Sequence, residues 1–552
     1  MPANGTEHPT HHELIAVETF PASNSTATAL QSPQVLVVDS SSSLGTPPLV
    51  HSTKKQRVSA AAAENESDQS QTSQQAVLDL ETFLNEVTSD SEQPSVMKDQ
   101  PFASLSLTAS DAQRATELLW NHHVQKLKTE RATEIANQEV TVPKKKNGAT
   151  ITMKYFCKIY HPSNSNTTSV NNNKMPLFIG LHGGGGCPAP INDQQWENHK
   201  RIYQCAYQAL ADQTQEPLLY VAPRAPTNNW NLWHEPHMDL LLDRLIANLT
   251  VHYATTTTDS TSSSCTIDTN RVYISGYSAG GDGIYMLAPR MADRWAAASM
   301  MAGHPNGVSL RGVYNLPFSL HVGGKDDAYN RNQVAREYKQ KLEQWQEQEQ
   351  EDGYQHIAAQ VYDDKGHWLG DVESPFIGWM AQHKRNANPE TVVWDSGSAR
   401  HDRFYWVLRH EPPPKRSGGG EVCVTRSTTT GSSGTTVVTI DLTKCPRPQE
   451  VGKLTLRFSD DSNSDNHLDC DNSPVVEIHV REKDDDGSTR QRLLQKEPLC
   501  RTIATLRQTL QERGDLNGIY SAQVTVDVSR NEAAATGGSK PKLRGSQKQI
   551  AG

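Results

Sequence analysis

A serine stands among small residues in the stretch GYSAG (276–280), directly after the apolar, β-branched run VYIS. This order predicts a strand that turns sharply into a helix, with Ser278 at the apex and Gly276 and Gly280 making room for the turn. The hydroxyl then projects above the sheet, and the first amides of the helix point at any negative charge that develops there. The pattern therefore predicts that Ser278 attacks an acyl group.

An acyl-transfer serine needs backbone N–H groups that stabilise the oxyanion of its tetrahedral intermediate. The run HGGGG (182–186) follows the strand-like segment LFIGL. In folds with this kind of serine turn, half of the oxyanion hole lies in such a loop, and the residue after the serine supplies the other half. We therefore predict that backbone amides of the run 182–186 and the amide of Ala279 form the hole. A flexible turn is the alternative for the glycine run considered alone.

The serine also needs a general base and an acid that orients the base. In this kind of fold both follow the serine along the chain, the acid first, on loops at strand ends. The segment FSLHVGGKDD offers Asp326 and Asp327, and the Gly-x-x-Asp spacing favours Asp326. His367 follows a predicted strand in QVYDDKGHW. We predict attack by Ser278, with His367 as general base and then acid, and Asp326 fixing its tautomer.

Three tryptophans lie in segments that follow predicted strands, namely Trp196, Trp230 and Trp233. Ligands of α/β proteins bind at the carboxyl edge of the sheet, so these rings are candidate substrate walls for an aromatic or sugar-like group. Packing within the fold is the equally good alternative. His234 and His237 have no third ligand placed beside them, so we predict no metal and no cofactor.

The elements that must position these residues follow from an alternation of short apolar runs with helical ones. Strand-like runs lie at 176–182, 218–222, 272–276, 296–303, 318–323 and 356–362. This alternation predicts an α/β fold, with a mostly parallel sheet covered by helices on both faces. We assign the catalytic domain to 106–387. It would begin with an amphipathic helix over 110–138, which Ser110 and Gln113 would cap.

The segments on either side of the predicted catalytic domain differ from it in composition. Residues 1–105 are rich in Ser, Thr and Gln without a sustained apolar period, which predicts a disordered tail. Residues 388–535 read as short alternating strands with one helix near 502–513, which predicts a small β-rich accessory domain. Residues 536–552 read as a flexible tail.

Charge and hydropathy exclude several classes of protein. The net charge is −10 and no basic stripe offsets it, which argues against a nucleic-acid partner. The amino terminus has neither the charged nor the apolar segment of a signal peptide, and no apolar run is long enough for a membrane span. Eight cysteines without a CxxC pair fit an intracellular setting. We therefore expect a cytoplasmic protein without a membrane partner.

Several longer motifs occur in order, namely GLHGGGG, NDQQWEN, APRAPTNNWNLWH, GYSAGGDGIYMLAPRMADRW, MMAGHPN and VGGKDDAYNRN. Together they resemble a group of esterases of the α/β-hydrolase fold, akin to polyhydroxybutyrate depolymerase-like and feruloyl-esterase-like hydrolases. The resemblance covers 105–385. It implies a doubly wound, mostly parallel sheet, the triad Ser278, Asp326 and His367, and an oxyanion hole formed by Gly184, Gly185 and Ala279. It does not fix the substrate.

The expected function is therefore the hydrolysis of carboxylic esters, small or polymeric, through an acyl-enzyme. A peptidase of the prolyl-oligopeptidase type is the alternative enzyme, because Gly-x-Ser-x-Gly-Gly is common there. Those enzymes normally carry a large amino-terminal β-propeller, whereas the segment before the catalytic domain is predicted to be disordered. A catalytically silent hydrolase-fold binding protein is the third possibility. Four intact chemical roles argue against it.

Overall fold

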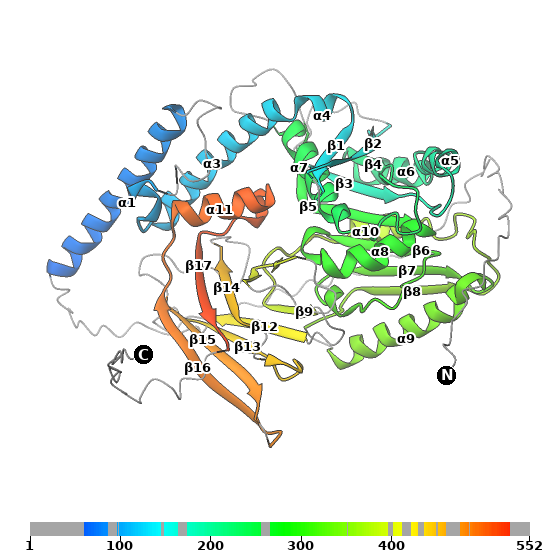
Figure 1. The fold of residues 1–552 in the computed structure, drawn as a ribbon. Coiled ribbons are helices and arrows are strands. Elements are labelled where there is room, and N and C mark those ends of the chain that lie inside the picture. The colour runs from blue at the N-terminus through cyan, green and yellow to red at the C-terminus, as the bar shows by residue number, and fades with distance from the viewer. Residues whose placement is uncertain are drawn as a thin grey trace, which may run out of the picture. The chain divides into compact units, whose positions relative to one another are not determined.

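A central eight-stranded sheet carries the catalytic candidates (Figure 1). Its strands pair in the order β1-β2-β4-β3-β5-β6-β7-β8, and all pairs from β4 to β8 are parallel. The strands are β1 Glu139–Pro143, β2 Thr150–Tyr160, β3 Lys174–Leu181, β4 Leu218–Pro223, β5 Thr266–Tyr277, β6 Ala297–Met301, β7 Phe318–Gly323 and β8 Ile357–Tyr362. The predicted α/β class with a mostly parallel sheet is confirmed.

This computed structural model describes residues 60–86, 97, 99–144, 148–163, 174–254, 265–349, 352–395, 401–410, 421–428, 435–448, 451–459, 475–484 and 486–529. All of them belong to one compact unit that begins at Ala60. Residues 1–59, the first part of the tail predicted over 1–105, lie outside the described residues, and so does the tail predicted over 536–552.

Helices cover both faces of the sheet, as a parallel sheet buried on both sides requires. The helices of the α/β part are α5 Ala189–His199, α6 Gln204–Thr214, α7 His237–Tyr253, α8 Ala279–Arg290, α9 Arg331–Gln348 and α10 Phe376–Ala381. Apolar residues of α7, α8 and α9 share one buried cluster with the sheet, while those of α6 and α10 form a second cluster. None of the described helices is long and apolar enough to cross a membrane.

Two strands at the edge of the sheet are absent from our sequence-based prediction. β1 and β2 pair antiparallel with each other, and β2 pairs antiparallel with β4. β2 alternates buried and exposed residues over its first half, so it lacks the continuous apolar run by which the inner strands were recognised. The single helix predicted over 110–138 is also divided, into α3 Ala109–Glu130 and α4 Ala132–Ala136.

The prediction of a disordered tail over 1–105 is wrong where the structure describes a helix in it, α1 Ala60–Glu86. Val77 and Leu80 of α1 are buried in a cluster with Leu119 of α3. With Ala76, these are the three buried apolar residues of α1 in the cluster, too few for a clear periodic signal in a polar segment, and α1 finds its apolar partners only in the folded protein. The amino-terminal cap of α3 is Thr108 rather than the predicted Ser110, because the Thr108 side chain accepts from the Asp111 N–H.

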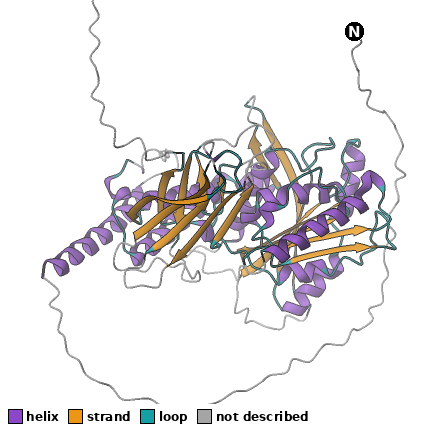
Figure 2. Cartoon of the chain, turned by 90° about the horizontal axis from the view of Figure 1, so that it is seen from below, coloured by secondary structure: helices purple, strands orange, loops and turns teal. Residues whose placement is uncertain are grey.

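The carboxyl-terminal region contains two sheets and one helix, α11 Ile503–Arg513 (Figure 2). The first sheet has the order β16-β15-β13-β12-β9 and the second β10-β11-β14-β17. Their strands are β9 Thr391–Asp395, β10 Arg403–Phe404, β11 Val407–Arg409, β12 Glu421–Thr428, β13 Thr436–Asp441, β14 Lys453–Phe458, β15 Val475–Lys483, β16 Thr489–Pro498 and β17 Ala522–Asp527. One buried apolar cluster includes Ile274 of β5 together with Val424 and Leu454 from these sheets, so the core is continuous.

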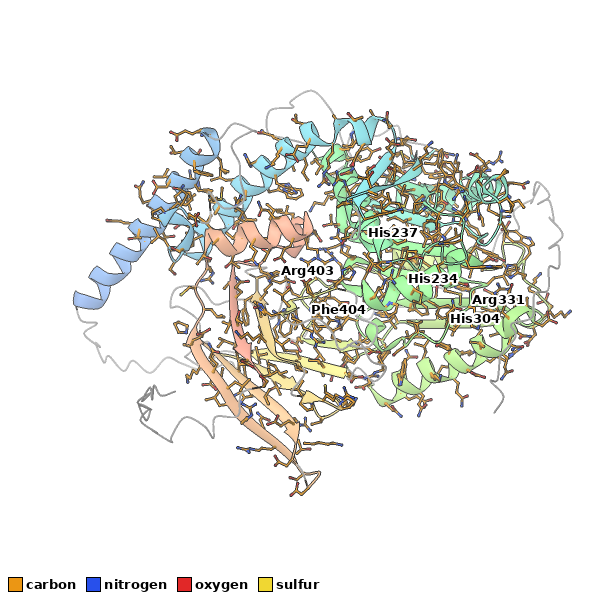
Figure 3. The ribbon with its side chains drawn as sticks, in the orientation of Figure 1. His234, His237, His304, Arg331, Arg403 and Phe404 are labelled. Atoms are coloured by element: carbon orange, nitrogen blue, oxygen red, sulfur yellow. The ribbon has the colours of Figure 1, made fainter. Side chains whose placement is uncertain are left out.

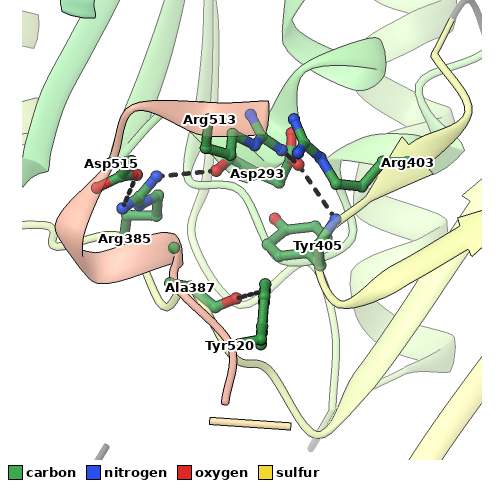
Figure 4. Close-up of a pocket in the computed structure, with 9 residues that line it drawn as sticks. Asp293, Arg385, Ala387, Arg403, Tyr405, Arg513, Asp515 and Tyr520 are labelled. Carbon is green, nitrogen blue, oxygen red and sulfur yellow. Dashed lines mark hydrogen bonds and ion pairs between the residues drawn. The ribbon is translucent and has the colours of Figure 1, made fainter. Parts of the chain in front are cut away.

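Buried ion pairs also join this region to the α/β sheet (Figure 4). Asp515, just past α11, accepts from Nη2 of Arg385 at 2.7 Å and from Nη1 of Arg294 at 3.4 Å. Arg513 of α11 pairs with Asp293, which follows α8. A small cavity lies among these side chains. Charges removed from water stabilise a fold only when they are paired, so each carboxylate offsets the burial of its arginines.

We expect Asp515→Asn to lower the free energy of unfolding at pH 7 by about 3 kcal/mol, because Arg385 would stay buried without this carboxylate and Arg294 would keep only its pair with Asp243. Urea unfolding followed by fluorescence would measure this loss. The matched control is Asp363→Asn, which removes an exposed partner of Arg336 and should change stability little. Equal losses in the two variants would contradict the role of the buried pair.

The same carboxylate should make stability depend on pH. Burial alone would raise the pKa of Asp515, but the guanidinium groups of Arg385 and Arg294 outweigh burial and lower that pKa to about 2. An aspartate in the unfolded chain has a pKa of about 3.9. The stabilisation by Asp515 is therefore complete above about pH 4 and is lost as the pH falls toward 2. In Asp515→Asn this part of the pH dependence should vanish.

Candidate active site

Ser278 occupies the turn between β5 and α8 in a conformation that few residues other than glycine adopt, with φ 57° and ψ −120°. Two close backbone approaches explain its glycine neighbours. A Cβ on Gly276 would overlap the carbonyl of Gly280, and a Cβ on Gly280 would overlap the carbonyl oxygen of Leu181 on β3. The Ser278 N–H donates to the Met301 carbonyl at 2.9 Å. The predicted strand, serine turn and helix are therefore present.

Side chains from three loops meet at the carboxyl edge of the sheet. His367, on the loop after β8, places Nε2 3.0 Å from Oγ of Ser278. Nδ1 of the same ring lies 2.7 Å from Oδ2 of Asp326, on the loop after β7. The Asp326 side chain is 1% exposed and that of His367 is 45% exposed, so the acid is shielded from water while a substrate can reach the base. The structure brings the three predicted triad residues together; their catalytic role stays a prediction.

The geometry distinguishes between the two aspartates that the sequence offered. Asp327 is exposed, and its carbonyl accepts from the Asn330 N–H at 2.8 Å in the turn that leads to α9. Asp326 faces His367 instead. Asp327 has helical backbone angles, with φ −84° and ψ −14°, because the chain already turns toward α9 at this residue.

Sequence analysis missed Tyr277, which holds the histidine loop in place. The buried hydroxyl of Tyr277 donates to the carbonyl of His367 at 2.8 Å and accepts from the N–H of Leu369 at 2.9 Å. Burial raises the pKa of Tyr277, so the phenol stays neutral and can donate. Its position beside Ser278 was visible in the sequence, but its partners lie some ninety residues away, and nothing in the residue type indicates them.

The glycine loop after β3 lies against the serine, but one predicted donor is already engaged. A Cβ on Gly183 would lie 3.2 Å from Cβ of Ser278. The Gly185 N–H donates to Oδ1 of Asn192 at 2.8 Å, so it is not available to an oxyanion and this part of the prediction is wrong. The amides of Gly184 and Ala279 remain the predicted donors. Ala279 is the first residue of α8, where amides have no partner within the helix.

His182 and Trp233 are structural supports of this loop. Nε2 of the buried His182 accepts from the Ala225 N–H at 3.0 Å, which leaves Nδ1 to donate to the Gly183 carbonyl at 2.6 Å. Burial lowers the pKa of His182 to about 4, so the ring is neutral at pH 7. Nε1 of the fully buried Trp233 donates to the carbonyl of His182 at 3.0 Å. The prediction of Trp233 as a substrate wall is therefore wrong.

The other two tryptophans differ in exposure. Trp196 donates from Nε1 to the carbonyl of Ala222 at 2.9 Å and packs against the second core cluster, so it is a packing residue rather than a substrate wall. Trp230 is 62% exposed and lies directly against Gly186 of the glycine loop. Of the three predicted walls, only Trp230 stays a candidate.

The described residues contain no group of three or more His, Cys, Asp and Glu side chains that could hold a metal ion. His234 and His237 flank the turn into α7 without such a third ligand (Figure 3).

The fold and the site together define a class of protein. A serine turn follows the strand β5 of a mostly parallel sheet, and the acid and the histidine come later in the chain at the ends of β7 and β8. The chain order Ser, Asp, His with this topology is that of the α/β-hydrolase fold. This agrees with the resemblance that the sequence motifs indicated.

Comparison with known proteins gives matches among solved structures alone. No protein-family model matches the sequence, and no curated protein does. A thermostable esterase is similar at 18% identity and a TM-score of 0.31, over 46% of this chain and 64% of that one. An S-formylglutathione hydrolase from Agrobacterium tumefaciens is similar at 14% identity and a TM-score of 0.28, over 44% of this chain and 94% of that one.

A feruloyl esterase module from Clostridium thermocellum is similar at 16% identity and a TM-score of 0.26, over 44% of this chain and 87% of that one. The chain thus spans somewhat less than two thirds of the thermostable esterase that it matches. Any inference about the reaction accordingly rests on the geometry of the site.

Proposed function

We propose that the protein is a serine hydrolase that cleaves carboxylic esters through an acyl-enzyme. One observation carries the proposal, namely the unbroken chain of contacts from Ser278 Oγ to His367 and from His367 to Asp326. Nucleophile, base and orienting acid have the mutual distances that proton transfer requires. The strained conformation of Ser278 supports the same conclusion, because such strain persists mainly where function uses it.

In the proposed reaction, His367 Nε2 takes the hydroxyl proton of Ser278 as Oγ attacks the ester carbonyl. The tetrahedral intermediate collapses when the carbon–oxygen bond to the alcohol breaks, and the imidazolium returns the proton to the leaving alcohol. Water then attacks the acyl-enzyme with the same histidine as base, which releases the acid and restores the serine. The ionised Asp326 holds the Nδ1 proton and stabilises the imidazolium.

The developing oxyanion would be bound by the N–H groups of Ala279 and Gly184. The amino-terminal end of α8 adds its positive dipole end at the same place, because Ser278 directly precedes the helix. Removing one such donor in serine hydrolases typically costs about 100-fold or more in kcat. Trp230, exposed beside this loop, would supply an apolar face for the acyl or alcohol group of the substrate.

An ester substrate is proposed rather than a prolyl peptide because of what precedes the sheet. The described residues before β1 form the helices α1, α3 and α4, which pack on α11 and α7. A propeller that gates peptides would be built of strands instead.

A fluorophosphonate probe tests the proposal without knowledge of the substrate. An activated serine attacks its phosphorus and displaces fluoride, so purified protein should gain one probe mass, mapped to Ser278. Ser278→Ala and heat-unfolded wild type, the two controls, should stay unlabelled. Folded wild type that stays unlabelled would overturn the proposal and favour a binding protein. A ladder of acyl esters beside prolyl peptides comes next; preferential peptide turnover would favour the peptidase.

A further inference from the structure

The triad acid has a second contact that the mechanism above does not use. Oδ2 of Asp326 faces His367, while Oδ1 lies 3.5 Å from Nη1 of Arg331, the first residue of α9. The Arg331 side chain is only 11% exposed, and Figure 3 places it at the edge of the sheet near His304. A guanidinium is always charged at the pH of any enzyme assay. The buried carboxylate thus lies between an imidazole and a permanent cation.

We propose that Arg331 is a positioning residue of the triad, which holds the Asp326 carboxylate turned so that Oδ2 meets the imidazole of His367. The inference rests on the proposed serine hydrolase function. Arg331 does not touch the reacting atoms; it acts through Asp326. The Asp326 side chain is only 1% exposed, and a charge removed from water is stabilised by each opposite charge that lies beside it.

The loop that delivers Arg331 to the acid is strained. Tyr329 and Asn330, the two residues before Arg331, both have left-handed conformations, with φ 57° and 56°. Two successive left-handed residues other than glycine are unfavourable and persist only where surrounding contacts enforce them. Here the Asn332 N–H donates to the Asp326 carbonyl at 2.9 Å and closes the loop. The chain thus folds back sharply and brings Arg331 beside Asp326.

Arg331 has few other anchors within the described part of the chain. Its Nε is buried and finds no hydrogen-bond partner there, and Asp326 is the carboxylate within ion-pair distance. The guanidinium also lies 4.9 Å from the ring centre of Tyr329, which covers it. If Arg331 served mainly for packing, we would expect its N–H groups to have other hydrogen-bond partners. Its Nη1 instead lies beside the carboxylate of Asp326.

Other charged groups lie on the elements that surround the imidazole of His367. Asp282 of α8 is partly buried, and burial raises its pKa; the His304 N–H, which donates to it at 2.6 Å, and the guanidinium of Arg331 act in the opposite direction. The loop after β7 adds Lys325 and Asp327, and the loop after β8 adds Asp371 and Glu373. Among these groups, Arg331 is the guanidinium whose charge acts on the carboxyls of both Asp326 and Asp282.

The rate of fluorophosphonate labelling of Ser278, measured from pH 5 to 9, tests the inference. We expect Arg331→Gln to label about 10-fold more slowly on the alkaline plateau, because Asp326 is held less firmly. Loss of the cation favours the imidazolium of His367, so the acid limb of the profile should move upward by about 0.5 to 1 pH unit. Arg331→Lys keeps the charge but not the planar fork. The acid limb of the Arg331→Lys profile should stay at the wild-type pH, while the labelling rate on its alkaline plateau should be lower than that of wild type.

The matched control is Arg336→Gln, which removes the same charge from the exposed part of α9 and should leave both plateau and limb unchanged. Thermal unfolding establishes that each variant is folded. If Arg331→Gln does not fold, the labelling profile of Arg331→Lys alone tests the inference. A wild-type plateau and limb in Arg331→Gln would overturn the inference, as would a shifted limb in Arg331→Lys. Failure of the proposed function looks different, because wild type itself would then stay unlabelled.

Discussion

Asp326→Asn should lower kcat for an ester substrate by about 10⁴-fold, whereas Asp327→Asn should stay within about 3-fold of wild type. The amide of an asparagine can donate to Nδ1 of His367 where the carboxylate accepts from it. The imidazole would then carry its proton on Nε2, which faces Ser278 at 3.0 Å, and could not accept the hydroxyl proton. The shape of the site would be kept while its base is lost.

The two variants are matched, because they remove the same charge from neighbouring positions of one loop. Only Asp326 is buried and in contact with His367, while Asp327 is exposed. Steady-state turnover of a chromogenic short-chain ester would measure both variants, and circular dichroism would confirm that they are folded. If Asp327→Asn lost the activity and Asp326→Asn kept it, the assignment of the acid would be reversed. Equal small losses would leave no role for an orienting acid.

Gly280→Ala should destabilise the protein by at least about 3 kcal/mol and abolish labelling of Ser278. The new Cβ would overlap the carbonyl oxygen of Leu181, which lies on the buried central strand β3. Main-chain atoms of a central strand cannot move aside as a flexible side chain can. Relief of the overlap must push α8 away from the sheet, and this moves both the serine turn and the amide of Ala279.

Gly378→Ala offers the matched control. Gly378 lies within α10, and a Cβ there would meet no atom within 4 Å. Alanine in a helix is favoured over glycine by about 0.5 to 1 kcal/mol, so this variant should be as stable as wild type or more so. Chemical unfolding and probe labelling would be measured on both. A Gly280→Ala variant with wild-type stability and labelling would contradict the close packing of the serine turn.

Much of the site could be predicted because its determinants are local in sequence. A sharp strand-to-helix turn needs small residues two positions before and after the serine, so GYSAG is visible without any structure. Parallel strands end at one edge of a sheet, and this brings residues after β7 and β8 to the serine from loops far apart in the chain. The same logic predicted the α/β class, since the strands β3, β4, β6 and β7 and the second half of β5 are almost continuously buried and therefore apolar.

The errors and omissions concern contacts that the residue pattern does not reveal. Gly185 was predicted to donate to the oxyanion, but its N–H donates to Asn192. Trp233 was a candidate substrate wall, but its ring lies in the core. The alternating strand β2 and the polar helix α1 were missed for a related reason, since each acquires a buried face only through neighbours that the pattern does not reveal.

The sequence by itself determined the chemistry on offer, because the turn around Ser278 and the strand-end positions of Asp326 and His367 follow from local backbone requirements and strand periodicity. Only the tertiary structure decided which groups are engaged and which are free. In the folded protein Asp326, and not Asp327, contacts the imidazole of His367, and Arg331 contacts the other oxygen of the same carboxylate. Trp230 stays exposed. Burial and hydrogen-bond partnership arise from contacts between distant segments, and no single segment of a chain encodes them.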